Sequence, residues 1–332
     1  MIRLTEGKRY ADMKTAKKSF FDTKVGRVIN NNFMLVVFII MILVFSCIEP
    51  NFRTVSNFLV IGRQVAVIAI LGYGLTFCIT AGEIDFSVGS ITALSGMVAG
   101  LVMNKTNLGI WAAAGLAILT GLVCGLLNGI MVTKLKLPSF LVTLGTTSVY
   151  SGIATTVTNQ KALVLYSDTF SNVWGNAKFL GIPLLLWWML AIGLVMYFFY
   201  HHSPFGSKVK ALGGNRSAAQ YSGIDTDGVI TRVMTISGLL AGICGLLMIA
   251  RLSQARPDVG GDYAMDAIAA VVLGGTAFNG GSGSIPMTAV GALILISITN
   301  ALMIMGIPTT VQSIIKGAII IVAVAMSTRT KR

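Results

Sequence analysis

Charged side chains are scarce in this chain. Only 11% of its 332 residues are Asp, Glu, Lys or Arg, whereas 55% are hydrophobic, and the mean hydropathy is +0.81. A soluble domain carries about 25% charged residues, so this sequence lacks the polar groups that would cover a water-exposed surface. The composition therefore predicts an integral membrane protein.

Paired cysteines and the common catalytic motifs are also lacking. Cys47, Cys78, Cys124 and Cys244 all lie in apolar stretches without paired spacing, which favours neither a disulfide framework nor a metal site. The sequence contains no His-Glu-x-x-His pattern and no Gly-Lys-Ser/Thr ending of a phosphate-binding loop. We expect no catalytic site, metal or cofactor in this chain, so any ATP that drives it would be bound by another protein.

Negative charge is scarcer than positive charge, and the excess is uneven. The net charge is +13, yet eight of the 25 Lys and Arg residues lie within residues 1–32, and Arg329, Lys331 and Arg332 end the sequence. Basic residues that flank apolar spans mark the cytoplasmic side of a membrane and can contact anionic lipid. We expect both termini to be cytoplasmic and no binding of nucleic acid.

Long apolar blocks with short polar breaks predict an all-α protein with about ten transmembrane helices, because a span needs about 20 residues. One block has only 14 residues, which indicates an interrupted segment. We expect the first block to stay as an uncleaved signal anchor. The predicted domains are a basic cytoplasmic segment 1–32, a single transmembrane domain 33–328 and a basic tail 329–332. The blocks cover residues 33–48, 58–80, 84–103, 108–132, 139–157, 179–200, 229–250, 265–278, 285–305 and 307–326.

A polar insert, about residues 203–228, separates two of these blocks. Asn215 is a good helix N-cap, residues 216–222 suit about two helical turns, and Gly223 suits the left-handed position that ends a helix. Six spans precede the insert, which places it in the cytoplasm, and its small residues would let a partner protein approach closely. The candidate contact residues are Gly213, Gly214, Asn215, Arg216, Ala218, Ala219, Ser222, Gly223 and Ile224.

Two carboxylates, Glu83 and Asp85, lie between apolar blocks and allow two interpretations. Asp85 could cap the following helix with help from Ser87, since acidic groups favour a helix N-terminus. Ionisable groups at membrane depth also line polar pathways. As a proton relay, the pair would instead indicate an ion-coupled secondary transporter.

Other polar residues within the apolar blocks are candidates for a translocation path. By polarity alone, the set is Gln64, Asp85, Ser87, Thr143 and Asn279. Arg63, Arg232, Arg251 and Lys316 are expected to extend to the membrane interface rather than to contact cargo. The Gly-rich stretch 274–284 lacks a nucleotide-binding ending and is expected to be a flexible or close-packed break between two half-spans.

Three stretches together resemble one family, the permease subunit of the ribose/xylose class of bacterial ABC importers. The first is Gly82–Ser90 (GEIDFSVGS), and the second is Ala211–Ile224 (ALGGNRSAAQYSGI), which resembles the family's cytoplasmic coupling segment. The third comprises Ala250–Pro257 (ARLSQARP), Tyr263–Thr276 (YAMDAIAAVVLGGT) and Gly280–Ile285 (GGSGSI). Glu83 and Pro286 depart from the family's usual residues.

The resemblance implies a multi-pass protein of the bacterial inner membrane that forms the path for a ribose- or xylose-like monosaccharide. Its implied partners are a second permease subunit, identical or a sibling, two ATP-binding subunits or one fused protein, and an extracytoplasmic sugar-binding protein. The 203–228 insert would be the coupling loop. Other cargoes stay open, namely a hexose, an autoinducer-like sugar derivative or a nucleoside.

Overall fold

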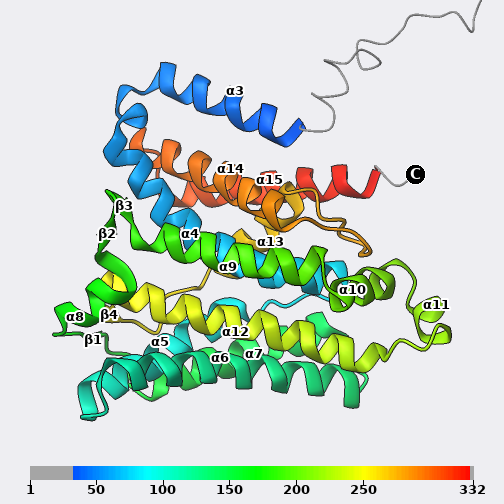
Figure 1. The fold of residues 1–332 in the computed structure, drawn as a ribbon. Coiled ribbons are helices and arrows are strands. Elements are labelled where there is room, and N and C mark those ends of the chain that lie inside the picture. Colours follow the sequence, from blue (N-terminus) through cyan, green and yellow to red (C-terminus); the bar gives the residue numbers. More distant parts are fainter. Residues whose placement is uncertain (1–32, 330–332) are drawn as a thin grey trace, which may run out of the picture.

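The computed structural model describes residues 33–329. The predicted basic segment 1–32, and residues 330–332 of the predicted tail, lie outside the described residues. Helices dominate the fold (Figure 1). The helices of ten or more residues are α3 (Phe33–Ile48), α4 (Val55–Thr80), α5 (Val88–Lys105), α6 (Gly109–Lys134), α7 (Ser139–Thr156), α9 (Leu184–His201), α10 (Pro204–Gly214), α12 (Thr226–Leu252), α13 (Tyr263–Leu273), α14 (Ile285–Ile304) and α15 (Thr309–Arg329).

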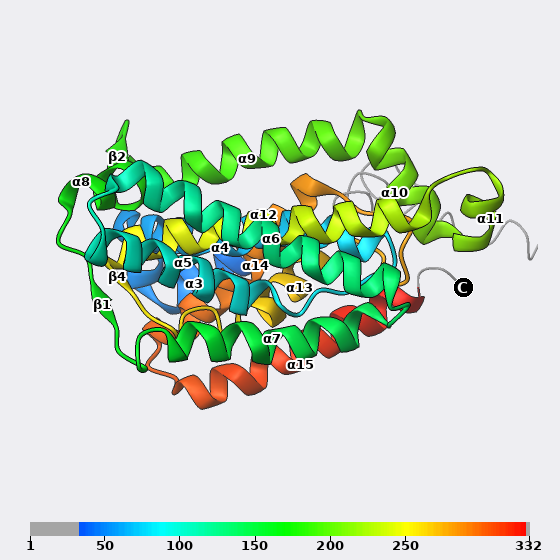
Figure 2. The same ribbon diagram turned by 90° about the horizontal axis from the view of Figure 1, so that it is seen from below.

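The shorter elements are a 3-10 turn (Pro50–Arg53), α8 (Asp168–Ser171), a π turn (Asn172–Asn176), α11 (Arg216–Tyr221), β1 (Leu163–Val164), β2 (Lys178–Phe179), β3 (Ile182–Pro183) and β4 (Gln254–Ala255). β1 pairs antiparallel with β4, and β2 pairs antiparallel with β3. The β1–β4 pair and α8 lie at one end of the helix stack, and α10 and α11 lie at the opposite end (Figure 2). We call these the strand end and the α11 end.

A helix overlaps each of the ten apolar blocks predicted from the sequence. Within residues 33–329, only α4, α6, α9, α12 and α14 are both long and apolar enough to cross a membrane. Parts of α3 and α15, and all of α13, form shorter apolar helices, while α5 and α7 carry many Ser, Thr and Gly residues. The multi-pass helical architecture is confirmed, whereas the count of about ten crossings stays a prediction.

The core is built around α4 and α12. In the most apolar 18-residue stretches of α4 and α12, 72% and 78% of the residues are buried. The corresponding shares are 33% for α6 and 17% for α9, whose apolar side chains face outward. Gly121 and Gly125 of α6 meet Gly238 and Gly242 of α12 with direct backbone contact. Small residues at such a crossing are typical of membrane helices, which gain from close van der Waals packing rather than from expulsion of water.

Two predicted breaks are present, and the Gly-rich one contacts the end of α4. Residues 81–87 join α4 to α5, and residues 274–284 join α13 to α14. The amide of Gly281 donates to the carbonyl oxygen of Thr80 at 2.9 Å, so the Gly-rich break closes over the last residue of α4. The break expected in 274–284 is confirmed, and of the two alternatives the structure shows the close-packed one.

Candidate functional site

The polar insert folds as two short helices, α10 and α11. In α11, the Asn215 Oδ1 atom accepts from the Ala218 amide at 3.0 Å, Gly223 has a φ of 78°, and the Ile224 amide donates to the Ala219 carbonyl at 3.1 Å. These contacts confirm the predicted cap, the short helix and its left-handed ending. The sequence interpretation missed α10, although Ser203 followed by Pro204 is a usual helix start.

Only part of the α11 region is available to a partner protein. Ala218 is exposed, but the side chain of Ala219 is only 5% exposed. Ala219 instead packs inward, about 100° around the helix from Ala218, so its part in a partner contact stays a prediction. Tyr221 is 92% exposed on the same short helix and was not predicted. An exposed Tyr beside small residues is a signal for a contact surface, because Tyr is enriched where interfaces concentrate their binding energy.

The end of α10 is wedged against the end of α4. A Cβ atom added to Gly213 would collide with the carbonyl oxygen of Thr80 and the amide nitrogen of Gly281. A Cβ atom added to Gly214 would meet nothing within 4 Å. Gly213 is thus a packing residue that joins the insert to α4 and to the Gly-rich break, whereas Gly214 faces open space.

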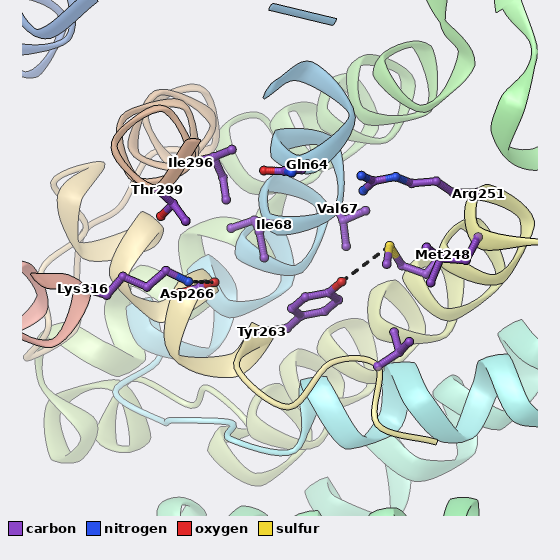
Figure 3. A pocket seen from close by; sticks show the side chains of 12 residues that line it. Gln64, Val67, Ile68, Met248, Arg251, Tyr263, Asp266, Ile296, Thr299 and Lys316 are labelled. Atoms are coloured by element: carbon purple, nitrogen blue, oxygen red, sulfur yellow. Dashed lines mark hydrogen bonds and ion pairs between the residues drawn. The ribbon is translucent and has the colours of Figure 1, made fainter. Parts of the chain in front are cut away.

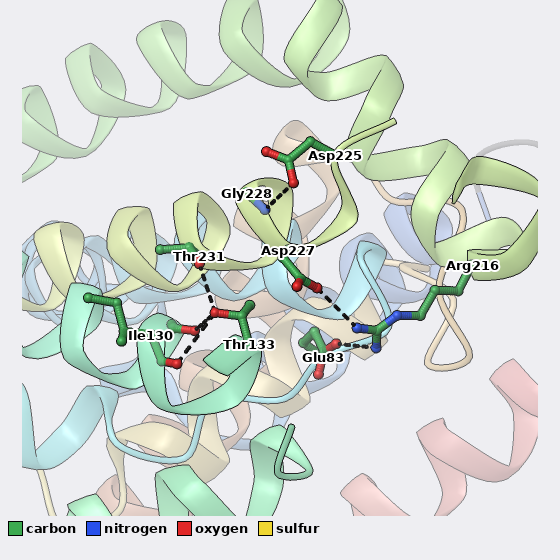
Figure 4. A network of polar contacts seen from close by, with 9 residues as sticks. Glu83, Ile130, Thr133, Arg216, Asp225, Asp227, Gly228 and Thr231 are labelled. Carbon is green, nitrogen blue, oxygen red and sulfur yellow. Dashed lines mark hydrogen bonds and ion pairs between the residues drawn. The ribbon is translucent and has the colours of Figure 1, made fainter. Parts of the chain in front are cut away.

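Arg216 forms a second connection between α11 and the membrane domain (Figure 4). Its guanidinium lies 3.5 Å from the Glu83 carboxylate and 3.9 Å from that of Asp227. Burial raises the pKa of Glu83, while a hydrogen bond with Ser139 and the Arg216 charge oppose that rise. Because the Arg216 side chain is 57% exposed, this pair orients the helix but contributes little stability, within about 1 kcal/mol.

Asp85 is fully buried and is the acceptor in a small hydrogen-bond network. Its Oδ1 atom accepts from the Ser87 amide at 2.9 Å and from the Ser87 hydroxyl at 2.6 Å. Its Oδ2 atom accepts from the Ser237 hydroxyl of α12 at 2.7 Å. The carboxylate therefore ties the 81–87 break to α12. The predicted cap is wrong in detail, because Asp85 bonds Ser87 rather than the first-turn amides of α5.

The network continues into α6 and α7. The Asn128 side-chain amide donates to the Ser87 hydroxyl at 2.8 Å, and the Tyr150 hydroxyl donates to Asn128 Oδ1 at 3.1 Å. Thr143 of α7 accepts from the Phe86 amide at 3.1 Å. Asp85, Ser87 and Thr143, three of the five path candidates, therefore meet around one break.

The other two path candidates lie elsewhere. Gln64 of α4 lines a cavity of about 340 Å³ between α4, α12, α13, α14 and α15 (Figure 3). Asn279 is exposed in the turn beside Gly280, which packs against Gly213. The five residues do not form one continuous surface within a single chain. Their role in a path stays a prediction.

Lys316 corrects the expectation that the four basic residues reach the membrane interface. Its Nζ lies 2.9 Å from the Asp266 carboxylate, and the two side chains are 20% and 9% exposed. Lys316 therefore points into the same cavity as Gln64. Among residues 33–329, no group of three or more His, Cys, Asp or Glu side chains is placed to hold a metal ion.

Comparison with known proteins identifies the family. Residues 57–324 match the model of the branched-chain amino acid transport system / permease component family. The chain belongs to this permease family. The match covers both breaks, the α10–α11 insert and every residue that lines the cavity. No solved structure matches the chain significantly.

Curated relatives of this permease cover nearly its whole length. It is 36% identical to the ribose import permease protein of Haemophilus influenzae over 94% of this chain and 96% of the relative. It is 36% identical to the D-allose transport system permease protein of Escherichia coli over 86% of this chain and 88% of the relative. It is 30% identical to the L-arabinose transport system permease protein of the same species over 93% of each. Similarity over this length indicates an inner-membrane, multi-pass permease.

Proposed function

We propose that this chain is the membrane-spanning subunit of an ABC importer for a ribose-type monosaccharide. The observation that carries the proposal is the match to ribose, allose and arabinose permeases across at least 86% of this chain. The capped α11 helix, exposed at one end of a helical membrane domain, supports it. A chain without a nucleotide-binding motif needs such a contact surface if ATP hydrolysis by a partner protein is to drive its conformational change.

The proposed arrangement assigns a partner to each end. Two ATP-binding subunits, or one fused protein, bind ATP and contact the α11 end in the cytoplasm, where both termini also lie. An extracytoplasmic sugar-binding protein delivers cargo to the strand end. A second permease subunit, identical or a sibling, completes the path between them. The chain itself is the transport subunit and catalyses no reaction.

Reconstituted transport tests this function. The chain is placed in liposomes with its proposed ATP-binding and sugar-binding partner proteins, and uptake of radiolabelled ribose, allose and arabinose is measured. We expect ATP-dependent uptake of at least one sugar, unaffected by a proton uncoupler. Uptake that persists without ATP and collapses with the uncoupler would instead establish the ion-coupled alternative.

Tyr221 offers a test of the contact surface. We expect Tyr221→Ala to weaken retention of the ATP-binding subunit by about tenfold or more, because truncating an interface aromatic often costs about 2 kcal/mol. The measurement is co-purification of the two proteins at graded concentrations. Tyr166→Ala is the matched control, because Tyr166 is 90% exposed but precedes α8 at the strand end. Equal retention by both variants would contradict the assigned surface.

A further inference from the structure

The cavity that contains Gln64 carries more polar groups than helix packing requires (Figure 3). Arg251 of α12 and the Lys316–Asp266 ion pair contribute charges, and Gln64 and Thr299 contribute an amide and a hydroxyl. Within the described part of the chain, no carboxylate lies at ion-pair distance from Arg251. Ionisable groups inside a membrane protein are costly and commonly mark a cargo pathway.

The remaining walls of the cavity are apolar, and its volume suits a small molecule. Val67 and Ile68 of α4, Ile296 of α14 and Met248 of α12 surround the polar groups, and the Tyr263 ring lies among them with its hydroxyl 3.7 Å from the Met248 sulfur. A volume of about 340 Å³ falls in the range of about 300–1,000 Å³ that small-molecule sites occupy. A monosaccharide needs such a mixture, because its ring edge is polar and its carbon faces are apolar.

The cavity also lies far from the coupling insert. Gln64 is about 24 Å along α4 from Thr80, which contacts Gly213. Arg251 is in the last turn of α12, whose first turn follows α11. The cavity is therefore toward the strand end, and α4 and α12 both run from it to the α11 end. A movement of α11 can therefore be transmitted to the cavity through two continuous helices, α4 and α12.

We propose that this cavity holds the transported sugar as a neutral monosaccharide in the half of the permease toward the strand end. The inference rests on the proposed import function and adds a location to it. Arg251 and Lys316 donate hydrogen bonds to sugar hydroxyls, and Asp266 accepts them. Gln64 does both. The Lys316–Asp266 pair also keeps most of the buried charge compensated when the cavity is empty.

Uptake by substituted complexes tests the assignment. In the reconstituted system, Arg251→Met and Gln64→Leu are compared with the control Arg232→Met. Arg232 is exposed and lies on α12, as Arg251 does, but about five turns nearer α11. We expect Arg251→Met to lower the maximal ribose uptake rate by about tenfold, since hydrogen bonds from a charged group are stronger than those from a neutral one. The half-saturating ribose concentration should not change, because the binding protein sets it.

A labelling measurement separates binding from a folding defect. Thr299→Cys is made with Cys47→Ser, which removes the exposed thiol; Cys78, Cys124 and Cys244 are buried. We expect ribose to slow modification of Thr299→Cys by a water-soluble thiol reagent. The control Asn107→Cys, in the exposed link between α5 and α6, should react equally with and without ribose.

Each outcome decides between the two proposals. If the wild-type complex imports ribose while Arg251→Met and Gln64→Leu import it equally well, the cavity assignment is overturned and the import function stands. The site for a neutral sugar would also be overturned if ribose failed to protect Thr299→Cys from modification. The same conclusion would follow if ribonate, the negatively charged acid of ribose, protected Thr299→Cys more strongly than ribose does. If the wild-type complex imports none of the three sugars, the import function fails and the cavity assignment falls with it.

Discussion

Asp85→Leu is expected to prevent stable folding of the permease. The buried carboxylate accepts from the Ser87 amide, the Ser87 hydroxyl and the Ser237 hydroxyl, and leucine leaves all three donors without their acceptor. An unsatisfied buried polar group costs about 1–3 kcal/mol, so the summed loss is about 3 kcal/mol or more. The measurement is the fraction of monodisperse protein recovered in detergent on heating.

Two serine substitutions provide the matched comparison for this prediction. Ser237→Ala removes one bond to Asp85 and should destabilise the protein by about 1 kcal/mol or more. Ser297 is equally buried, but its hydroxyl has no hydrogen-bond partner within the described residues, so Ser297→Ala should be nearly neutral. Equal effects of the two substitutions would show that the Asp85 network does not hold the break to α12.

Asp85→Asn distinguishes the two interpretations of the carboxylate. Asparagine keeps one oxygen to accept from Ser87, and its amide can donate to the Ser237 hydroxyl, so we expect normal folding and sugar uptake. A titrating group is what a proton relay requires, and asparagine cannot supply it. A folded Asp85→Asn protein that transports no sugar would contradict the positioning role and favour a functional carboxylate.

Local signals in the sequence predicted local structure well. Asn215, followed two turns later by Gly223, specifies α11, since a cap and a left-handed ending involve only neighbouring residues. In the same way, the run of glycines in 274–284 marks a break regardless of what packs on it. α10 was missed because it ends in two glycines, which are poor helix formers, although the fold accommodates both.

Contacts between distant residues were not predictable. Lys316 forms an ion pair with Asp266, which is fifty residues away in the sequence, and no pattern in either segment indicates the pair. Gln64 and Asn279 were grouped by polarity, yet the fold places them at opposite ends of the domain, because α4 separates Gln64 from the Thr80–Gly281 contact. Polarity within an apolar block identifies a candidate, but only tertiary packing decides which candidates share a site.

The two glycines that end α10 should respond very differently to the same small change. Gly213→Ala places a methyl group against the Thr80 carbonyl and the Gly281 amide, so α10 must move away from α4 or the Gly-rich break must open. Overpacking of this kind costs about 1–3 kcal/mol, and more when the obstructing atoms are backbone. We expect ribose uptake to fall by at least about tenfold, because the insert then no longer moves with α4.

Gly214→Ala is the control for that experiment, since its added methyl group meets nothing within 4 Å. Both glycines belong to the last turn of the same helix, so alanine changes helix propensity equally at the two positions. Uptake and ATP hydrolysis are measured together for each variant. With Gly213→Ala, hydrolysis that continues while uptake falls would locate the defect in the transfer of movement from the insert to α4. Equal uptake by both variants would show that the Gly213–Thr80 contact does not transmit it.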